Sequence, residues 1–234
     1  MMRYAEYLRP SRIPMRLPVA AKERGLVLYM PMVSPHGNIL QDFSGYGNHG
    51  TIHGATWTDG KFGKALYFDG EDDYVEIPDD ESLDITDEIT IEAWVKLDSS
   101  WSDYGHICTK RDGTDTAWQF YIGPDRKLGA NGGAYTEDAH GATQIPTEQW
   151  THVTVVITGN TFNFYVNGNF DATDTATALA TNSVPVSIGA RFNGYPSLAY
   201  PFVGTIDEVR IYNRALSEEE IKAHYLGLQY LIRG

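Results

Sequence analysis

Acidic and amide side chains gather in one glycine-rich stretch, and side chains of this kind could hold a metal ion. Asp42 and Asn48 both lie in the segment DFSGYGNHG. The backbone carbonyls of such a loop, with carboxylate and amide oxygens, are the ligands that Ca²⁺ prefers. Asp207 is the third candidate, because it is expected to share a strand face with Val209 and Ile211, and a buried carboxylate needs a partner or a metal. In the alternative arrangement Asp42 caps its own turn, and Asp207 pairs with an arginine or with backbone amides.

A carboxylate pattern found in glucanases occurs at Glu71–Glu76, where EDDYVE satisfies E-x-D-x-x-E. A retaining glycosidase needs two carboxyls about 5–5.5 Å apart that face the sugar in a cleft. Here the pattern follows Phe68-Asp69-Gly70, a sequence typical of a turn, so we interpret the match as coincidental. The chain contains no nucleophile elbow and no P-loop. We therefore expect a protein that is not an enzyme.

Aromatic residues in or beside the expected loops are candidates for sugar contact, because an exposed ring can stack on the face of a sugar. Ligand pockets combine such rings with a few polar groups that fix orientation. Aromatic residues also fill cores or anchor interfaces, so both roles remain open at this point. The candidates are Trp101, Tyr104, Trp118, Tyr135 and Tyr195.

Short strands separated by turn residues must position these side chains. Glu88–Leu97 alternates strictly between aliphatic and mostly polar residues, which predicts a strand with one face in the core. Further strands are predicted at Leu26–Met32, Trp150–Thr158, Thr161–Asn167, Val184–Ala190, Val203–Tyr212 and Leu228–Arg233. The pattern predicts an all-β fold, a two-sheet antiparallel jelly-roll sandwich.

One short helix is predicted near the C-terminus. Ser217 followed by Glu220 forms a capping box, and Glu218 and Glu219 add negative charge to the first turn. We expect this helix to run from Glu218 to about Tyr225 and to end near Gly227.

Three sets of segments carry a family resemblance. They are DFSGYGNHG with GKALYFDG and DYVEI, TIEAWVK with WTHVTV and FYVNG, and GTIDEVRIYNRALSEEE. In order and spacing they resemble the laminin-G-like, concanavalin A-like jelly-roll family, from about Leu26 to Leu226. The resemblance implies that the stretches containing Asp42, Asn48 and Asp207 lie together and hold one structural calcium ion. It leaves the function open, since such domains occur in enzymes, adhesins, binding modules and virion proteins.

The first 25 residues differ in charge from the rest of the chain. Residues 1–24 contain six basic and two acidic side chains, a net charge of +4, so the remainder of this chain of net charge −13 carries −17. Pro10, Pro14 and Pro18 oppose a helix and favour an extended path. We expect a basic arm over residues 1–25 that docks on an acidic neighbouring subunit, and a jelly-roll domain over residues 26–234. A solvated tail is the alternative. The arginines expected to make the contacts are Arg3, Arg9, Arg12 and Arg16.

The composition of the chain limits which classes of partner it can bind and where the protein can be located. The net charge of −13 argues against nucleic-acid binding. The sequence has no apolar run long enough to insert into a membrane, and its first 24 residues lack the apolar region of a signal peptide. Cys108 is the single cysteine, which excludes an internal disulfide. We expect a location on a virion surface or outside a cell.

Two function hypotheses from different classes follow. The first is a non-catalytic structural protein of a large assembly, such as a virion decoration or appendage protein. In that hypothesis the arm docks on neighbouring subunits and the chain forms a homo-oligomer or joins other structural proteins. The second is a calcium-dependent, lectin-like carbohydrate-binding adhesion module. The basic arm favours the first, and the loop aromatics and the resemblance favour the second.

Overall fold

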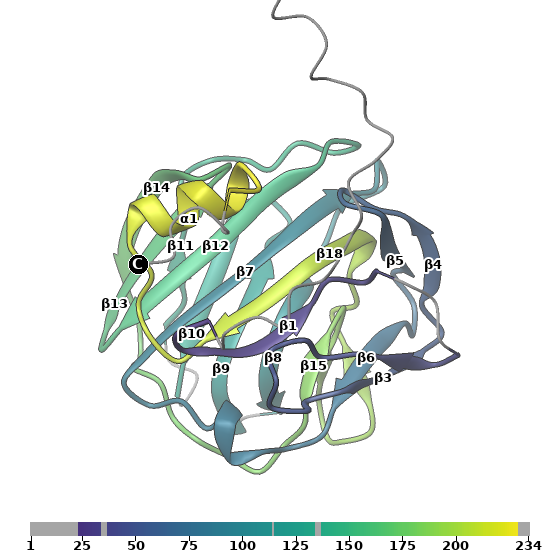
Figure 1. The fold of residues 1–234 in the computed structure, drawn as a ribbon, viewed down its shortest axis with the longest axis horizontal. Coiled ribbons are helices and arrows are strands. Elements are labelled where there is room, and N and C mark those ends of the chain that lie inside the picture. Colours follow the sequence, from purple (N-terminus) through teal and green to yellow (C-terminus); the bar gives the residue numbers. More distant parts are fainter. Residues whose placement is uncertain (1–22, 34–36, 114, 134–136, 229–234) are drawn as a thin grey trace, which may run out of the picture.

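Alternating strands build a sandwich of two mainly antiparallel sheets in the computed structural model, which describes residues 23–33, 37–113, 115–133 and 137–228 (Figure 1). Sheet A lies in front in Figure 1, and sheet B lies behind it. The strands of sheet A, in spatial order, are β14 (Asn169–Thr175), β13 (Thr161–Val166), β12 (Thr151–Thr158), β7 (Glu88–Leu97), β18 (Val203–Tyr212), β5 (Lys64–Asp69) and β4 (Thr56–Asp59), and β1 (Leu26–Met30) also pairs with β18.

Sheet B contains most of the short strands. In spatial order its strands are β11 (Ala139–His140), β10 (Leu128–Gly132), β9 (Asp115–Ile122), β8 (Gly105–Asp112), β15 (Val186–Ile188), β6 (Tyr74–Ile77), β3 (Gly50–His53) and β2 (Ile39–Leu40), with β16 (Arg191–Phe192) and β17 (Leu198–Ala199) attached beside β8. A single 3₁₀ turn at Glu81–Leu83 precedes β7. The predicted jelly-roll sandwich is confirmed.

The core lies between the sheets and follows the predicted alternation. In β7 the aliphatic residues from Ile89 to Leu97 all belong to the core cluster, and they face Ile107, Phe120 and other side chains of sheet B. The opposite face of β7 is also buried, since Glu92 is 0% and Trp94 2% exposed. A strand covered on both faces needs an outer layer, which the C-terminal helix supplies in part.

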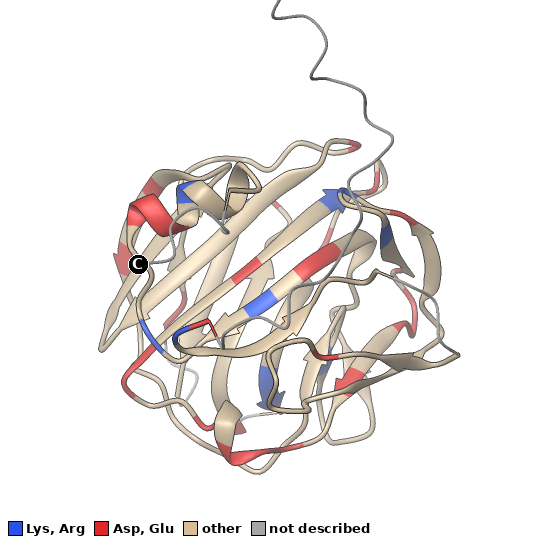
Figure 2. Cartoon of the chain, in the orientation of Figure 1, with Lys and Arg blue, Asp and Glu red and all other residues tan. Residues whose placement is uncertain are grey.

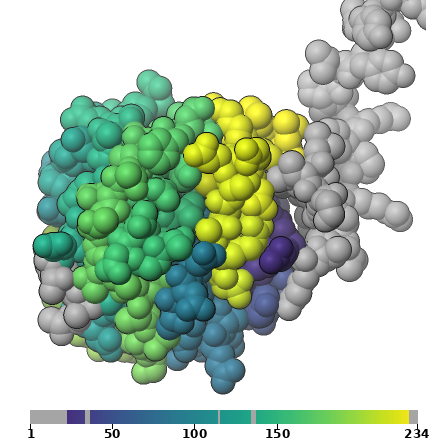
Figure 3. All heavy atoms as spheres, turned by 90° about the vertical axis from the view of Figure 1, so that its left-hand side faces the viewer, coloured from purple at the N-terminus to yellow at the C-terminus, as the bar shows by residue number. Residues whose placement is uncertain are grey.

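Helix α1 (Glu218–Tyr225) has the predicted bounds, and both hydrogen bonds of its capping box are present. It packs on the outer face of sheet A, beside the hairpin of β13 and β14 (Figures 1 and 3). Ile221 and Leu216 form a small apolar cluster there with Tyr212 of β18. Tyr225 stacks on Trp94 of β7 with ring centroids 5.6 Å apart.

A bulge in β18 overturns one expectation. The register shifts between Asp207 and Arg210, and Glu208 adopts a φ of 54°. This bulge changes which residues face inward, so Val209 and Ile211 lie in the core while Asp207 lies on the outer face opposite Trp94. Asp207 therefore does not share the apolar face on which the sequence placed it.

Two expectations concern residues outside those described. The predicted strand Leu228–Arg233 falls almost entirely on residues 229–234, which the structure does not describe. The basic arm was predicted over residues 1–25, and its arginines Arg3, Arg9, Arg12 and Arg16 lie in residues 1–22, which are also outside the described residues. The last three residues of the arm, 23–25, are described. Glu23 accepts a hydrogen bond from the Tyr212 hydroxyl at 3.1 Å and lies 3.4 Å from His224 Nε2.

Candidate functional site

A hollow of about 270 Å³ opens on the face of sheet B that is turned away from the core. The strand β9 explains its position, because Trp118 and Phe120 point into the core while Gln119 and Tyr121 point outward. In the paired strand β8, His106 lies opposite Tyr121. The residues lining the hollow are Tyr104, His106, Arg111, Gln119, Tyr121, Asp138, Arg191 and Tyr200.

Two exposed tyrosines stand at the rim of this hollow. Tyr104 and Tyr200 are 41% and 40% exposed, and their rings meet edge to face at 5.5 Å. Tyr121 forms the floor beneath them, with its centroid 5.7 Å from that of Tyr104. Tyr200 has a φ of 51°, a backbone conformation that costs free energy in a bulky residue and concentrates at ligand sites. The hollow therefore presents rings at different depths.

The floor depends on a glycine. A Cβ atom added at Gly129 of β10 would lie 2.3 Å from the Tyr121 ring, which is far inside van der Waals contact. The pairing of Gly129 with Tyr121 across the two strands places the ring directly over the backbone. Only glycine lets Tyr121 lie flat enough to leave the hollow open.

Two arginines bring positive charge to the hollow. Arg111 donates from Nε to the Gly113 carbonyl at 2.9 Å and from Nη1 to Gln119 Oε1 at 3.0 Å. The guanidinium of Arg191 lies over the Tyr200 ring, 4.7 Å from its centroid. Within the described residues, no group accepts a hydrogen bond from the buried Nε and Nη1 of Arg191. Such unsatisfied donors are costly in a folded protein and mark positions that a ligand can complete.

His106 lies between the arginines and Tyr121. It is 3% exposed, and its Nδ1 has no hydrogen-bond partner in the described part of the chain. Burial, followed by the charges of Arg191 and Arg111, lowers the pKa of His106 well below its usual range. The imidazole is therefore neutral near pH 7 and offers a polar atom rather than a charge.

A second, larger hollow of about 560 Å³ adjoins the first, and the two share Tyr104 and Tyr200. Trp101 lies along it, but is 8% exposed and donates from its indole to the Gly123 carbonyl at 3.0 Å. Acidic Asp69, Glu71 and Asp103 are exposed along this second hollow.

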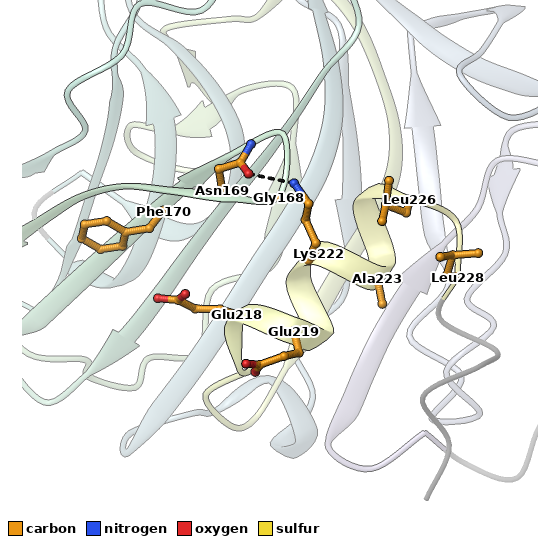
Figure 4. Close-up of a pocket in the computed structure, with 9 residues that line it drawn as sticks. All are labelled: Gly168, Asn169, Phe170, Glu218, Glu219, Lys222, Ala223, Leu226 and Leu228. Carbon is orange, nitrogen blue, oxygen red and sulfur yellow. Dashed lines mark hydrogen bonds between the residues drawn. The ribbon is translucent and has the colours of Figure 1, made fainter.

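Another hollow, of about 490 Å³, lies between α1 and the start of β14 (Figure 4). It is mainly apolar, with Phe170, Leu226 and Leu228 between 42% and 53% exposed. Lys222 reaches across to Asn169 Oδ1 at 2.7 Å, and Glu218 and Glu219 stand at one end (Figure 4).

Donors from the protein itself surround the carboxylate of Asp42, the first of the proposed calcium ligands. The Asp42 carboxylate accepts five hydrogen bonds, from the amides of Tyr29, Ser44, Gly47 and Asn48 and from the Ser44 hydroxyl. Donors already occupy its lone pairs, so Asp42 closes its own turn, and the residues present do not fit calcium. Asn48 instead donates to Val27 O at 2.9 Å and to Ser82 Oγ at 2.9 Å.

Asp207 has a different set of partners from Asp42. It accepts hydrogen bonds from the amides of Lys61, Phe62 and Glu208 at 2.8–3.1 Å, and burial raises its pKa to about 7. Backbone amides, which were the alternative in the sequence, thus satisfy this carboxylate. One group of three carboxylates within 4.8 Å of one another occurs among the described residues, at Asp69, Asp72 and Asp73.

The predicted aromatic residues have separate positions. Tyr104 lies at the rim of the sheet B hollow, and Trp101 lies beside the adjoining one. Trp118 is 0% exposed. Its side chain points into the core, so it cannot stack on a sugar. Tyr195 is 49% exposed but lies against Phe192 and donates to Glu76 outside the hollow. Tyr135 is outside the described residues.

The E-x-D-x-x-E residues do not form a facing pair. Glu71 lies at an exposed turn, whereas Asp73 is 5% exposed and accepts the amide of Asp69 at 2.9 Å. Glu76, on β6, accepts the Tyr195 hydroxyl at 3.1 Å. Within the described chain, Asp138 is the only carboxylate that lines the sheet B hollow, whereas glycoside hydrolysis by the usual mechanisms requires two.

A buried charge cluster on the outer face of sheet A forms a further polar group. Figure 2 shows it as red and blue bands in the middle of β7 and β18. Glu92 lies 2.8 Å from His224 Nδ1 and 3.3 Å from Arg210 Nη1. Despite burial, His224, His152 and Arg210 hold the pKa of Glu92 down at about 2. This cluster is enclosed, and we interpret it as structural.

The family model described as the concanavalin A-like lectin/glucanases superfamily matches residues 69–222. The chain therefore belongs to this superfamily, and the resemblance found in the sequence is confirmed. A search of curated proteins found no match. No helix among the described residues is long and apolar enough to span a membrane.

Several solved structures share the fold. Domain 4 of AbnA, an extracellular arabinanase of Geobacillus stearothermophilus solved with arabinotriose, is 24% identical over 86% of this chain and 98% of that one, with a TM-score of 0.62. Botulinum neurotoxin type C, whose cell entry depends on two ganglioside molecules, is 18% identical over 88% of this chain and 52% of that one, at 0.64. Trypanosoma rangeli sialidase is 17% identical over 87% and 33%, at 0.63. The chain thus spans about half of the toxin structure and a third of the sialidase.

Proposed function

We propose that this protein is a non-catalytic carbohydrate-binding module, with its ligand in the sheet B hollow. One observation carries the proposal: Tyr104, Tyr121 and Tyr200 meet there around buried polar side chains. Aromatic faces bind the apolar faces of sugar rings, and the polar groups select hydroxyls. One related fold was solved with arabinotriose, and another belongs to a toxin whose cell entry depends on ganglioside molecules, which supports this class of ligand. A location outside the cell accords with glycan partners.

Tyrosine substitutions test this proposal. Tyr200→Ala removes a rim ring and should weaken oligosaccharide binding by about tenfold in calorimetry. Tyr195→Ala is the matched control, because Tyr195 is a similarly exposed tyrosine outside the hollow, and it should bind as the wild type does. Equal affinity in both variants would contradict the proposal.

Two further results are expected of a non-catalytic, calcium-independent module. No shortened oligosaccharide should accumulate when the protein is incubated with its ligand. A chelator should leave binding unchanged, because Asp42 has no oxygen left for calcium.

Assembly through the basic arm is the second proposal. The apolar hollow beside α1 favours it, because Phe170, Leu226 and Leu228 are exposed there next to Glu218 and Glu219. The occupant we propose is the arm of a second copy, residues 1–24. Its net charge of +4 complements the glutamates, and it contains apolar residues such as Leu8, Ile13 and Leu17. A role in a virion or appendage is a narrower form of this proposal.

A further inference from the structure

The sheet B hollow has a charge that its surroundings lack. The chain has a net charge of −13, and acidic residues line the adjoining hollow. The sheet B hollow instead contains the arginines Arg111 and Arg191 and one lining carboxylate, Asp138. Two positive side chains gathered in an acidic molecule would repel a cation and attract an anion. A site for a neutral sugar needs no such charge.

Arg191 provides the hydrogen-bonding argument. Nε and Nη1 of its guanidinium are both buried, and in the described chain neither donates a hydrogen bond. No carboxylate among the described residues forms an ion pair with Arg191. Charged donors that lack an acceptor favour an anionic oxygen, such as one of a carboxylate or sulfate group. The stacking of Arg191 on Tyr200 fixes the guanidinium at the rim.

His106 adds an independent observation. Its imidazole is nearly fully buried and lines the same hollow, and its Nδ1 lacks a partner among the described residues. A sugar hydroxyl is a polar group that can both donate and accept, and so it can satisfy this atom. The hollow thus contains unsatisfied groups for an anion and for a hydroxyl close together.

We propose that the ligand is an acidic sugar whose carboxylate or sulfate group binds Arg191 beside Arg111, while its ring contacts Tyr104 and Tyr200. This inference rests on the proposed carbohydrate-binding function and specifies the ligand class. Nucleic acid is a poor alternative. The hollow would bind a single anionic group of its ligand, whereas the acidic surface around it would repel the other phosphates of a nucleic acid.

Calorimetry of the full chain with four probes tests the proposal. The probes are a galacturonic acid trisaccharide, sialyllactose, a heparin-derived sulfated tetrasaccharide and neutral arabinotriose. We expect at least one acidic probe to bind about tenfold or more tightly than the neutral one, with affinity falling as salt rises. The first three probes distinguish a carboxylate from a sulfate.

Two substitutions connect the preference to one side chain. Arg191→Gln should weaken acidic probes by about ten- to hundredfold and leave any neutral binding nearly unchanged. Arg191→Lys, which keeps the charge and loses the several donors of the guanidinium, should fall between. Arg24→Gln is the control, because it removes the same charge from an exposed residue outside the hollow. An unchanged thermal transition establishes that each variant folds.

The outcomes separate the two proposals. Tight binding of acidic probes that depends on Arg191 supports both. Equal binding of acidic and neutral probes, unaffected by Arg191→Gln, overturns the acidic-ligand inference and leaves the carbohydrate-binding function standing. Acidic probes that lose equal affinity in Arg24→Gln also overturn the inference, since net charge alone would then explain the preference. Binding of no sugar overturns both.

Discussion

Glu92 is a carboxylate with no exposed surface, and its charge is balanced by the histidine beside it. The Glu92 and Glu23 carboxylates raise the pKa of His224 to about 9, against the effect of burial. Because this folded-state value exceeds the ordinary 6.5, the protonated His224 contributes stability below pH 6.5, and the contribution is lost as pH rises through 9. His152, whose pKa burial lowers to about 4, stays neutral throughout this window.

The expected loss between pH 6.5 and 9 is about 3 kcal/mol in the free energy of unfolding. Urea unfolding across that range should show it in the wild type and show little of it in His224→Gln. His140→Gln is the control, because His140 is exposed, and it should keep the wild-type slope. A His224→Gln variant with the full pH dependence would show that another group titrates.

At the scale of elements, the β9–β10 pair determines whether the hollow exists. In Gly129→Ala the new Cβ would displace the Tyr121 ring, since the two would be 2.3 Å apart. We expect sugar affinity to fall by about tenfold and stability by about 1–3 kcal/mol. Gly123→Ala is a control, because its Cβ would approach the flexible Asp125 side chain at 3.1 Å and would meet Lys127 O and the Tyr104 ring only at an ordinary contact distance of 3.9 Å. Wild-type affinity in Gly129→Ala would show that Tyr121 is not the floor of the site.

Elements with local signals could be predicted from the sequence. The alternation of Glu88–Leu97 gave both bounds of β7, and Ser217 with Glu220 gave those of α1. The bulge at Glu208 has no local signal; it lies where β18 changes from pairing with β5 to pairing with β1, which is a long-range feature. Asp207 was therefore placed on the wrong face.

The candidate site was mostly missed for a related reason. Of its lining residues only Tyr104 was predicted, because the others come from β8, β9, β16 and separate loops that meet through long-range pairing. The alternation of Trp118, Gln119, Phe120 and Tyr121 in β9 was the available signal. It would have placed Tyr121 outside and Trp118 inside.

At the scale of the whole molecule, the contrast between a basic segment and an acidic body governs association. If the arm of one copy docks beside α1 of another, the full chain should form a defined oligomer in low salt, and a chain that starts at Gly25 should be monomeric. Light scattering after size exclusion measures this, and high salt should weaken the oligomer. Phe170→Ser, which alters the apolar hollow alone, should also yield monomers.

If the full chain and the chain that starts at Gly25 are both well-folded monomers in low salt, the assembly proposal is contradicted. The carbohydrate-binding proposal would be unaffected by that result. An oligomer that survives removal of residues 1–24 would place the interface elsewhere on the body. Tyr200→Ala should not change the oligomeric state, because Tyr200 belongs to the sheet B hollow.

The most direct test of the central claim is an NMR titration of the ¹⁵N-labelled chain with an acidic oligosaccharide that binds in calorimetry. The account predicts that shifts concentrate in β8 and β9, at Tyr104 and Tyr200, and at the Nε–Hε signal of Arg191. Shifts confined to α1 and β14, or spread evenly over the surface, would contradict a binding site on the outer face of sheet B.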